Sequence, residues 1–246
     1  AGFQVSYPEA GLVTTLTMPD TQMPAIPASG TGTAFFKEVA GRMMLAQIGP
    51  SGLDTTLQPN LGGNKCAMWM PPGGATTVPG VFGMSALTAV GTAVARTIVA
   101  SNTINRMTRL GFVSAATAGQ LAGAREAVAK FTTGAGGGLG GFFIRYRFGV
   151  SDAATVAGAR MFVGLRNITS APTNVEPTTL TQSIGIAQLS SSDNLHIVYS
   201  NATVKTPIDL GSNIPASSTA DAYELVLFAP NAGGVYYQVT RLNTPY

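Results

Sequence analysis

Charged side chains are scarce in this chain. Asp, Glu, Lys and Arg make up 10% of its 246 residues, whereas about 25% is usual in a globular protein. The 14 basic and 11 acidic residues are spread along the sequence, and only Arg145 and Arg147 suggest a basic patch. Because nucleic-acid-binding proteins gather Lys and Arg on one face, we expect no nucleic-acid partner.

The residues that most often perform catalysis or hold a metal are nearly absent. Cys66 and His196 are the single cysteine and the single histidine, so the chain can form neither an intrachain disulfide nor a zinc site built on these two residue types alone. Cys66 is expected to be a small buried apolar residue. His196 could serve in a Ser–His–Asp triad, but it lies between Leu195 and Ile197 in a run typical of a strand. We expect it to face solvent or a subunit boundary.

Motifs for phosphate, calcium or nucleophile chemistry are also missing. No Gly-Lys-Ser/Thr follows the glycine-rich run at residues 134–141, and no Asp-x-Asp-x-Asp loop or Gly-x-Ser-x-Gly elbow occurs. Glycoside hydrolysis needs two facing carboxylates, and most of the 11 acids, such as Asp152 and Asp221, lie at expected turns. The sequence predicts no catalytic residue, no metal site and no cofactor. Polysaccharide cleavage stays open as a secondary alternative.

No apolar run is long enough to cross a membrane, although 45% of the residues are hydrophobic. The best stretch, Met84–Ala100, is interrupted by Thr88, Gly91 and Arg96 and falls short of the roughly 18 apolar residues that a span requires. We therefore expect no membrane insertion. Gly (30 residues), Ala, Thr and Ser take the place of charge, which suits turn-rich β structure or a surface hidden in an assembly.

Proline punctuates the N-terminal part of the chain, at Pro8, Pro19, Pro24 and Pro27. Because proline fixes φ and lacks a backbone N–H, residues 1–40 are predicted to form an extended arm without a core of its own. Such an arm could lie along a neighbouring subunit or act as a flexible tether, and both interpretations stay open.

From residue 41 onwards, short apolar strands alternate with turns. In one strand Arg145 and Arg147 fall on one face, and Ile144, Tyr146 and Phe148 on the other. The predicted fold is an all-β antiparallel β-sandwich of jelly-roll or lectin-like type. The predicted strands are Arg42–Ile48, Lys65–Met70, Ala93–Ala100, Ile104–Val113, Phe142–Val150, Arg160–Arg166, Ser183–Leu189, Leu195–Tyr199, Thr203–Ile208, Ala222–Phe228 and Val235–Leu242.

The sandwich domain is expected to span residues 41–246 and to be best defined over 139–246. A hairpin turn is expected at 231–234, between the last two strands. Ser114–Phe131 could instead contain a short helix, with Glu126 placed four residues before a lysine.

Several runs in the C-terminal half carry a resemblance to a known family. They are, in chain order, Gly140–Val150, Ala159–Leu165, Ile184–Ile186, Asp193–Tyr199, Tyr223–Leu225 and Val239–Thr244. This succession resembles the C-terminal region of tailed-bacteriophage tail-fibre and related virion structural proteins, and its order is similar to a concanavalin-type lectin jelly roll.

The resemblance implies a homotrimeric appendage on the phage particle surface or tail. Such an appendage docks to other virion proteins and contacts a host surface glycan or protein. Residues 1–40 lack the heptads of a coiled-coil stalk. We expect a tail-fibre module for host attachment, with a purely structural capsid or tail decoration or connector protein as the alternative and a polysaccharide depolymerase as the second alternative.

Exposed aromatic rings and side-chain amides are the residues we expect to bind a sugar, because the apolar face of an aromatic ring stacks on a pyranose. The alternative interpretation is a subunit contact, since Trp, Met and Tyr are also frequent in interfaces. The candidate ligand-binding residues are Trp69, Tyr199, Asn201, Tyr236 and Tyr237.

Overall fold

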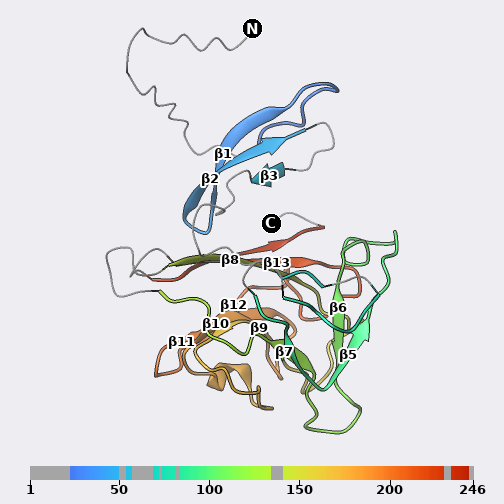
Figure 1. Ribbon diagram of the computed structural model, residues 1–246, viewed down its shortest axis with the longest axis vertical. Coiled ribbons are helices and arrows are strands. Elements are labelled where there is room, and N and C mark those ends of the chain that lie inside the picture. The colour runs from blue at the N-terminus through green and yellow to red at the C-terminus, as the bar shows by residue number, and fades with distance from the viewer. Residues whose placement is uncertain are drawn as a thin grey trace. The chain divides into compact units, whose positions relative to one another are not determined.

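The computed structural model describes residues 23–49, 54–56, 69–71, 74–80, 84–133, 141–229 and 234–243. The chain divides into two compact units, Ala1–Pro59 and Asn60–Tyr246. Both are built from antiparallel strands (Figure 1). Within the described residues the only helical element is a single 3-10 turn at Pro177–Thr179.

The first unit contains a three-stranded antiparallel sheet in the order β1 (Thr33–Val39), β2 (Arg42–Ile48) and β3 (Asp54–Thr56). Ala40 and Gly41 connect β1 to β2, and both have positive φ, 51° and 77°. Two such residues form the type I′ turn whose twist matches that of the flanking strands.

The predicted N-terminal arm is therefore wrong over residues 33–39. Residues 33–39 pair along their whole length with β2, and Phe35 packs with Ala46 and Ile48 in a small core. The unit boundary follows Pro59 rather than residue 40. The proline-rich residues 1–22 lie outside the described part of the chain.

The second unit contains a four-stranded sheet in the order β12-β11-β10-β9 and a three-stranded sheet in the order β14-β13-β8. Two small sheets, β4-β7 and β5-β6, accompany them and lie to one side of the two larger sheets (Figure 1). The strands are β4 (Thr88–Val90), β5 (Thr92–Ala95), β6 (Leu110–Val113), β7 (Gly123–Arg125), β8 (Phe142–Phe148), β9 (Met161–Arg166), β10 (Ser183–Gln188), β11 (Leu195–Ser200), β12 (Ile208–Asp209), β13 (Tyr223–Ala229) and β14 (Tyr236–Arg241).

The two larger sheets pack face to face. Alternate residues of β11 and β13 supply most of the fully buried side chains, because successive strand residues point to opposite faces. These side chains, with Ile186 of β10, form one core cluster: Ile186, Leu195, Ile197, Tyr223, Leu225 and Leu227. The predicted all-β antiparallel sandwich is confirmed.

The chain crosses between the two sheets twice. It leaves β8 for β9, runs through β10, β11 and β12 in order, and returns to β13 and β14 beside β8. Strands β9 to β12 thus form a meander, and β8, β13 and β14 form the opposite sheet. This topology is simpler than the double Greek key of a jelly roll.

Strands of the C-terminal half lie close to their predicted positions, and most errors fall elsewhere. Ala93–Ala100 and Ile104–Val113 are strands only at 93–95 and 110–113, because hydrogen-bonded turns occupy residues 100–106. Ser114–Phe131 forms no helix, and three of its residues form β7. Thr203–Ile208 is strand only from Ile208, where β12 begins. Residues 69 and 70 of the predicted strand Lys65–Met70 are not strand, and its remainder, like 231–233, lies outside the described residues.

Candidate functional site

The face of the β14-β13-β8 sheet that is turned away from the core, here called the outer face, has its exposed side chains on β8 and β14, because Glu224 and Val226 of β13 are only 9% and 1% exposed. Since Tyr223, Leu225 and Leu227 are core residues, Glu224, Val226 and Phe228 lie on the opposite face. Strand register aligns each with one residue of β8 and one of β14. The three resulting rows are Phe143–Phe228–Tyr236, Arg145–Val226–Gln238 and Arg147–Glu224–Thr240.

The first row is aromatic throughout. The ring centroids of Phe143 and Phe228 are 6.4 Å apart with the planes tilted by 57°. Those of Phe228 and Tyr236 are 6.3 Å apart at 29°, a stacked arrangement. Phe228 is half-buried, while Tyr236 is 52% exposed. The row therefore holds the Tyr236 ring against the sheet and leaves about half of it in contact with solvent.

The third row holds a carboxylate between two guanidinium groups. Arg147 Nε donates to Glu224 Oε2 at 2.8 Å, and Arg145 Nε lies 3.5 Å from Oε1. The Glu224 side chain is 11% exposed, against 32% for Arg145 and 50% for Arg147. The three groups carry a net charge of +1, with the positive charge outermost. The predicted shared face of the two arginines is confirmed.

This face combines groups suited to binding rather than to acid–base chemistry. Tyr236 offers an aromatic ring, and the two guanidinium groups offer donors suited to carboxylate or phosphate. Gln238 lies on the row between them. Glu224 is the one carboxylate in the three rows, and its ion pairs with Arg145 and Arg147 already occupy it.

The predicted ligand-binding residues do not form one site. Tyr236 lies on the outer face just described. Tyr237 follows it directly and pairs with Leu227, so it points to the opposite side of β14. Tyr199 and Asn201 lie at the end of β11, in the other sheet. Trp69 is half-buried, and its indole Nε1 is buried without a hydrogen-bond partner.

Asn201 already uses its side-chain and backbone oxygens as acceptors within the chain. Its Oδ1 accepts from the backbone N–H of Thr203 at 2.9 Å, and its carbonyl accepts from Gln182 N at 2.7 Å. The amide thus stabilises a turn. Tyr199, the other predicted residue at this end of the sheet, is 39% exposed.

Phe143, Phe228, Arg145, Arg147 and Gln238 were missed as site residues by sequence reasoning. Part of the signal was present, since the alternation of β13 places Glu224 and Phe228 on the face opposite the core. The pairing of β8 with β13 was not predictable from spacing, because Arg147 and Glu224 are 77 residues apart.

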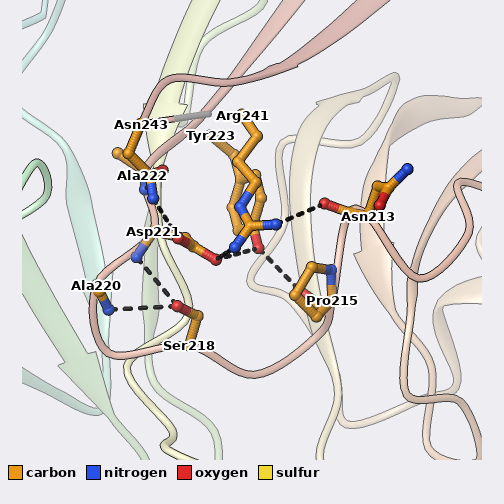
Figure 2. Close-up of polar contacts among 9 residues, drawn as sticks. All are labelled: Asn213, Pro215, Ser218, Ala220, Asp221, Ala222, Tyr223, Arg241 and Asn243. Atoms are coloured by element: carbon orange, nitrogen blue, oxygen red, sulfur yellow. Dashed lines mark hydrogen bonds and ion pairs between the residues drawn. The ribbon is translucent and has the colours of Figure 1, made fainter. Parts of the chain in front are cut away.

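A second polar cluster lies where the loop after β12 meets the sheet (Figure 2). Asp221 Oδ2 lies 2.7 Å from Arg241 Nη2, and the Asn243 amide donates to Oδ1. The Tyr223 hydroxyl donates to the Pro215 carbonyl at 3.0 Å. Arg241 Nη1 donates to the Asn213 carbonyl at 3.1 Å. These groups bind one another and fasten the loop at 213–221 to the sandwich.

Protonation in this cluster follows from its burial and its hydrogen bonds. Burial alone would raise the pKa of Asp221, but hydrogen bonds from Asn243 and Ser218 and the charge of Arg241 hold that pKa below its usual value. Burial, with the nearby Asp221 carboxylate, raises the pKa of Tyr223 to about 12. Asp221 is therefore a structural anion, and the Tyr223 hydroxyl keeps its proton at neutral pH.

His196 is buried, since its residue is only 8% exposed. Of the two predicted settings the solvent-facing one is wrong, and the subunit boundary stays a prediction. His196 pairs across β11 and β12 with Asp209, and its Nδ1 lies 3.0 Å from the carbonyl oxygen of Asn194. Asp209 accepts from Gly211 N at 2.8 Å and from Asn194 Nδ2 at 3.0 Å. The Gly211 hydrogen bond is the main cause that lowers the pKa of Asp209. These bonds join the ends of β11 and β12.

Two further searches of the described residues gave negative results. No group of three or more His, Cys, Asp or Glu side chains is placed to hold a metal ion. No helix there is long and apolar enough to span a membrane. Comparison of the chain with protein-family models, curated proteins and solved structures gave no match.

Proposed function

We propose that this chain is a host-attachment module of a phage virion, and that the outer face of its β14-β13-β8 sheet binds a surface saccharide. The observation that carries the proposal is the aromatic row that ends in the half-exposed ring of Tyr236, beside the exposed guanidinium groups of Arg145 and Arg147. The sequence resemblance to tail-fibre proteins supports the virion assignment.

The geometry suits a saccharide for a physical reason. A pyranose ring presents C–H groups on one face and hydroxyls around its edge. An aromatic ring can cover the C–H face, while the edge needs hydrogen-bond partners. Tyr236 is held by Phe228 on a rigid strand, so stacking on it costs little conformational entropy. Arg147 lies two rows away on the same face and can contact an acidic substituent of a longer polymer.

Assembly into an oligomer, for which a trimer is proposed, is supported by the surface composition. Large apolar side chains that are at least 37% exposed occur throughout the described residues, among them Ile98, Val99, Val113 and Val128. Such side chains mark contacts with other proteins where they form a contiguous patch. Other copies of the chain and neighbouring virion proteins are the proposed partners.

The proposal is tested by binding of the fluorescently labelled full chain to cells of a susceptible host. Tyr236→Ala should weaken binding about tenfold, the loss typical of an aromatic anchor. Tyr199→Ala is the matched control, because Tyr199 is 39% exposed on the other sheet, and it should leave binding unchanged.

Equal binding by the wild-type chain and Tyr236→Ala would contradict the proposed site. If the wild-type chain binds no susceptible host, the attachment role itself fails. The decoration or connector role would then be favoured.

A further inference from the structure

A long stretch of this chain has no negative charge. No Asp or Glu occurs between Asp54 and Glu126. The same stretch contains five basic residues: Lys65, Arg96, Arg106, Arg109 and Arg125. Three of them, Arg96, Arg106 and Arg109, lie in the connection between β5 and β6 at residues 96–109, which contains no acidic residue.

The connection is an ordered turn structure. Val99 N donates to the Asn105 carbonyl at 2.9 Å, and Asn105 N donates to Asn102 Oδ1 at 3.0 Å. Ile104 packs directly against Gly149. A Cβ atom added at Gly149 would collide with the Ile104 side chain. Asn102 Nδ2 also reaches the Thr219 carbonyl at 3.4 Å. The arginines are therefore presented on a fixed backbone.

Arg109 and Arg96 lie next to each other at the base of this turn. The pairing of β5 with β6 ends with Ala95 opposite Leu110. The next residues along the two strands are therefore Arg96 and Arg109. The Arg109 guanidinium donates to Asn105 Oδ1 at 2.6 Å and to the Asn105 carbonyl at 3.0 Å. The Arg96 side chain lies over Gly111. A Cβ atom added at Gly111 would be 2.6 Å from the Nε of Arg96.

Arg96 and Arg109 bring two like charges together at this position. Burial, together with the positive charge of Arg96, lowers the pKa of Arg109. Among the residues that the structure describes, no carboxylate forms an ion pair with Arg96, Arg106 or Arg109. Arg106 is exposed within the same turn. An incoming anion would relieve the repulsion and gain charge-assisted hydrogen bonds.

We propose that the turn at residues 96–109 is an anion-binding surface for an acidic polysaccharide, in which Arg96 and Arg106 contact carboxylate or phosphate groups. Arg109 is a positioning residue, because its hydrogen bonds hold the turn. The choice of a polysaccharide rests on the proposed attachment function. A single-stranded nucleic acid is disfavoured because residues 96–109 contain no aromatic ring on which bases could stack.

The test measures binding of the full chain to polygalacturonate, inorganic polyphosphate and neutral dextran across a range of salt concentrations. The wild-type chain should bind at least one of the two polyanions and not dextran, and the stronger one identifies carboxylate or phosphate as the preferred group. Arg96→Gln and Arg106→Gln should each weaken binding about two- to fivefold. Each should also reduce the slope of log affinity against log salt concentration by about one.

Arg160→Gln is the matched control, because Arg160 is exposed outside this turn and the variant loses the same charge. An equal loss of affinity in Arg160→Gln would show a net-charge effect and overturn the proposal. Binding to a single-stranded oligonucleotide at least as tight as to polygalacturonate would overturn it in favour of a nucleic acid. Circular dichroism of Arg106→Gln, whose side chain is exposed, checks that the fold is retained.

The two proposals can fail separately. If Tyr236→Ala loses host binding while Arg96→Gln and Arg106→Gln bind polyanions and cells as the wild type does, the anion surface is wrong and the attachment site stands. If the arginine variants lose polyanion affinity while Tyr236→Ala binds cells normally, the anion surface stands and the Tyr236 site is wrong.

Discussion

The carboxylate of Asp221, two residues before Tyr223 of β13, lies 2.7 Å from the guanidinium of Arg241 at the end of β14. Asp221 is 3% exposed, so this ion pair is largely removed from water. It joins the loop before β13 to the last residue of β14 (Figure 2). The stability of the sandwich should therefore depend on the ionisation of Asp221.

Acid should destabilise the protein through this group. The folded-state pKa of Asp221 is lowered relative to an unfolded value near 3.9, so its contribution is present above about pH 4. It is lost as pH falls through the folded pKa. Urea unfolding at pH 7 and at pH 3 should show this loss for the wild-type chain. Asp221→Asn should be about 2–3 kcal/mol less stable at pH 7, because Arg241 is left without its partner, and should show a weaker decline in acid.

Alkali should act through the neighbouring tyrosine. The pKa of Tyr223 is raised to about 12 from an unfolded value near 10, so its contribution is complete below about pH 10 and is lost as pH rises through the folded pKa. Tyr223→Phe should lessen the alkaline decline without abolishing it, because burial also raises the pKa of Tyr146. It should cost about 1 kcal/mol at pH 7 for the hydrogen bond to Pro215. An unchanged slope between pH 10 and pH 11.5 would show that other groups govern this range.

Gly164 and Gly185 form a cross-strand pair in the four-stranded sheet. A Cβ atom on Gly185 would collide with the Val163 carbonyl and lie 2.9 Å from the Phe162 ring. Gly185→Ala should therefore lower the free energy of unfolding by about 2–3 kcal/mol, because backbone atoms must shift. Gly123→Ala is the control, since nothing lies within 4 Å of the added atom. Equal melting temperatures for the two variants would refute this account of the sheet.

The Glu224 carboxylate offsets the repulsion between Arg145 and Arg147. Glu224→Gln should lower stability by about 1 kcal/mol, a modest figure because both arginines are substantially exposed. The loss should grow at low ionic strength, where repulsion between the guanidinium groups is less screened. Thr240→Val, on the same row, is a control that leaves the charges intact. A loss that does not change with salt would mean that the ion pairs are not its cause.

Alternation along single strands was sufficient to predict which face of β8 would carry Arg145 and Arg147, because only one face of a sandwich strand enters the core. It failed in the connection between β5 and β6. There the Thr- and Ile-containing sequence is typical of a strand, but the side chains of Asn102 and Arg109 hydrogen-bond to the backbone of Asn105 and hold a turn.

The candidate site was only partly predictable. Tyr236 could be selected as an aromatic residue near the end of a strand. Its stacking partner Phe228 and the arginines come from pairings that depend on the packed sheet, and the partners in β8 and β13 are far apart in the sequence. His196 shows the reverse case, since β12 and the carbonyl of Asn194 enclose a residue expected at the surface.

The measurement that most directly tests the account is hydroxyl-radical footprinting of the full chain with and without polysaccharide extracted from a susceptible host. Bound saccharide should protect Tyr236 and Phe228 from oxidation while Tyr199, equally aromatic but on the other sheet, reacts at its unbound rate. Protection at Tyr199 with none at Tyr236, or no protection at either ring at saturating polysaccharide, would contradict the proposal that the outer face of the β14-β13-β8 sheet is the binding surface.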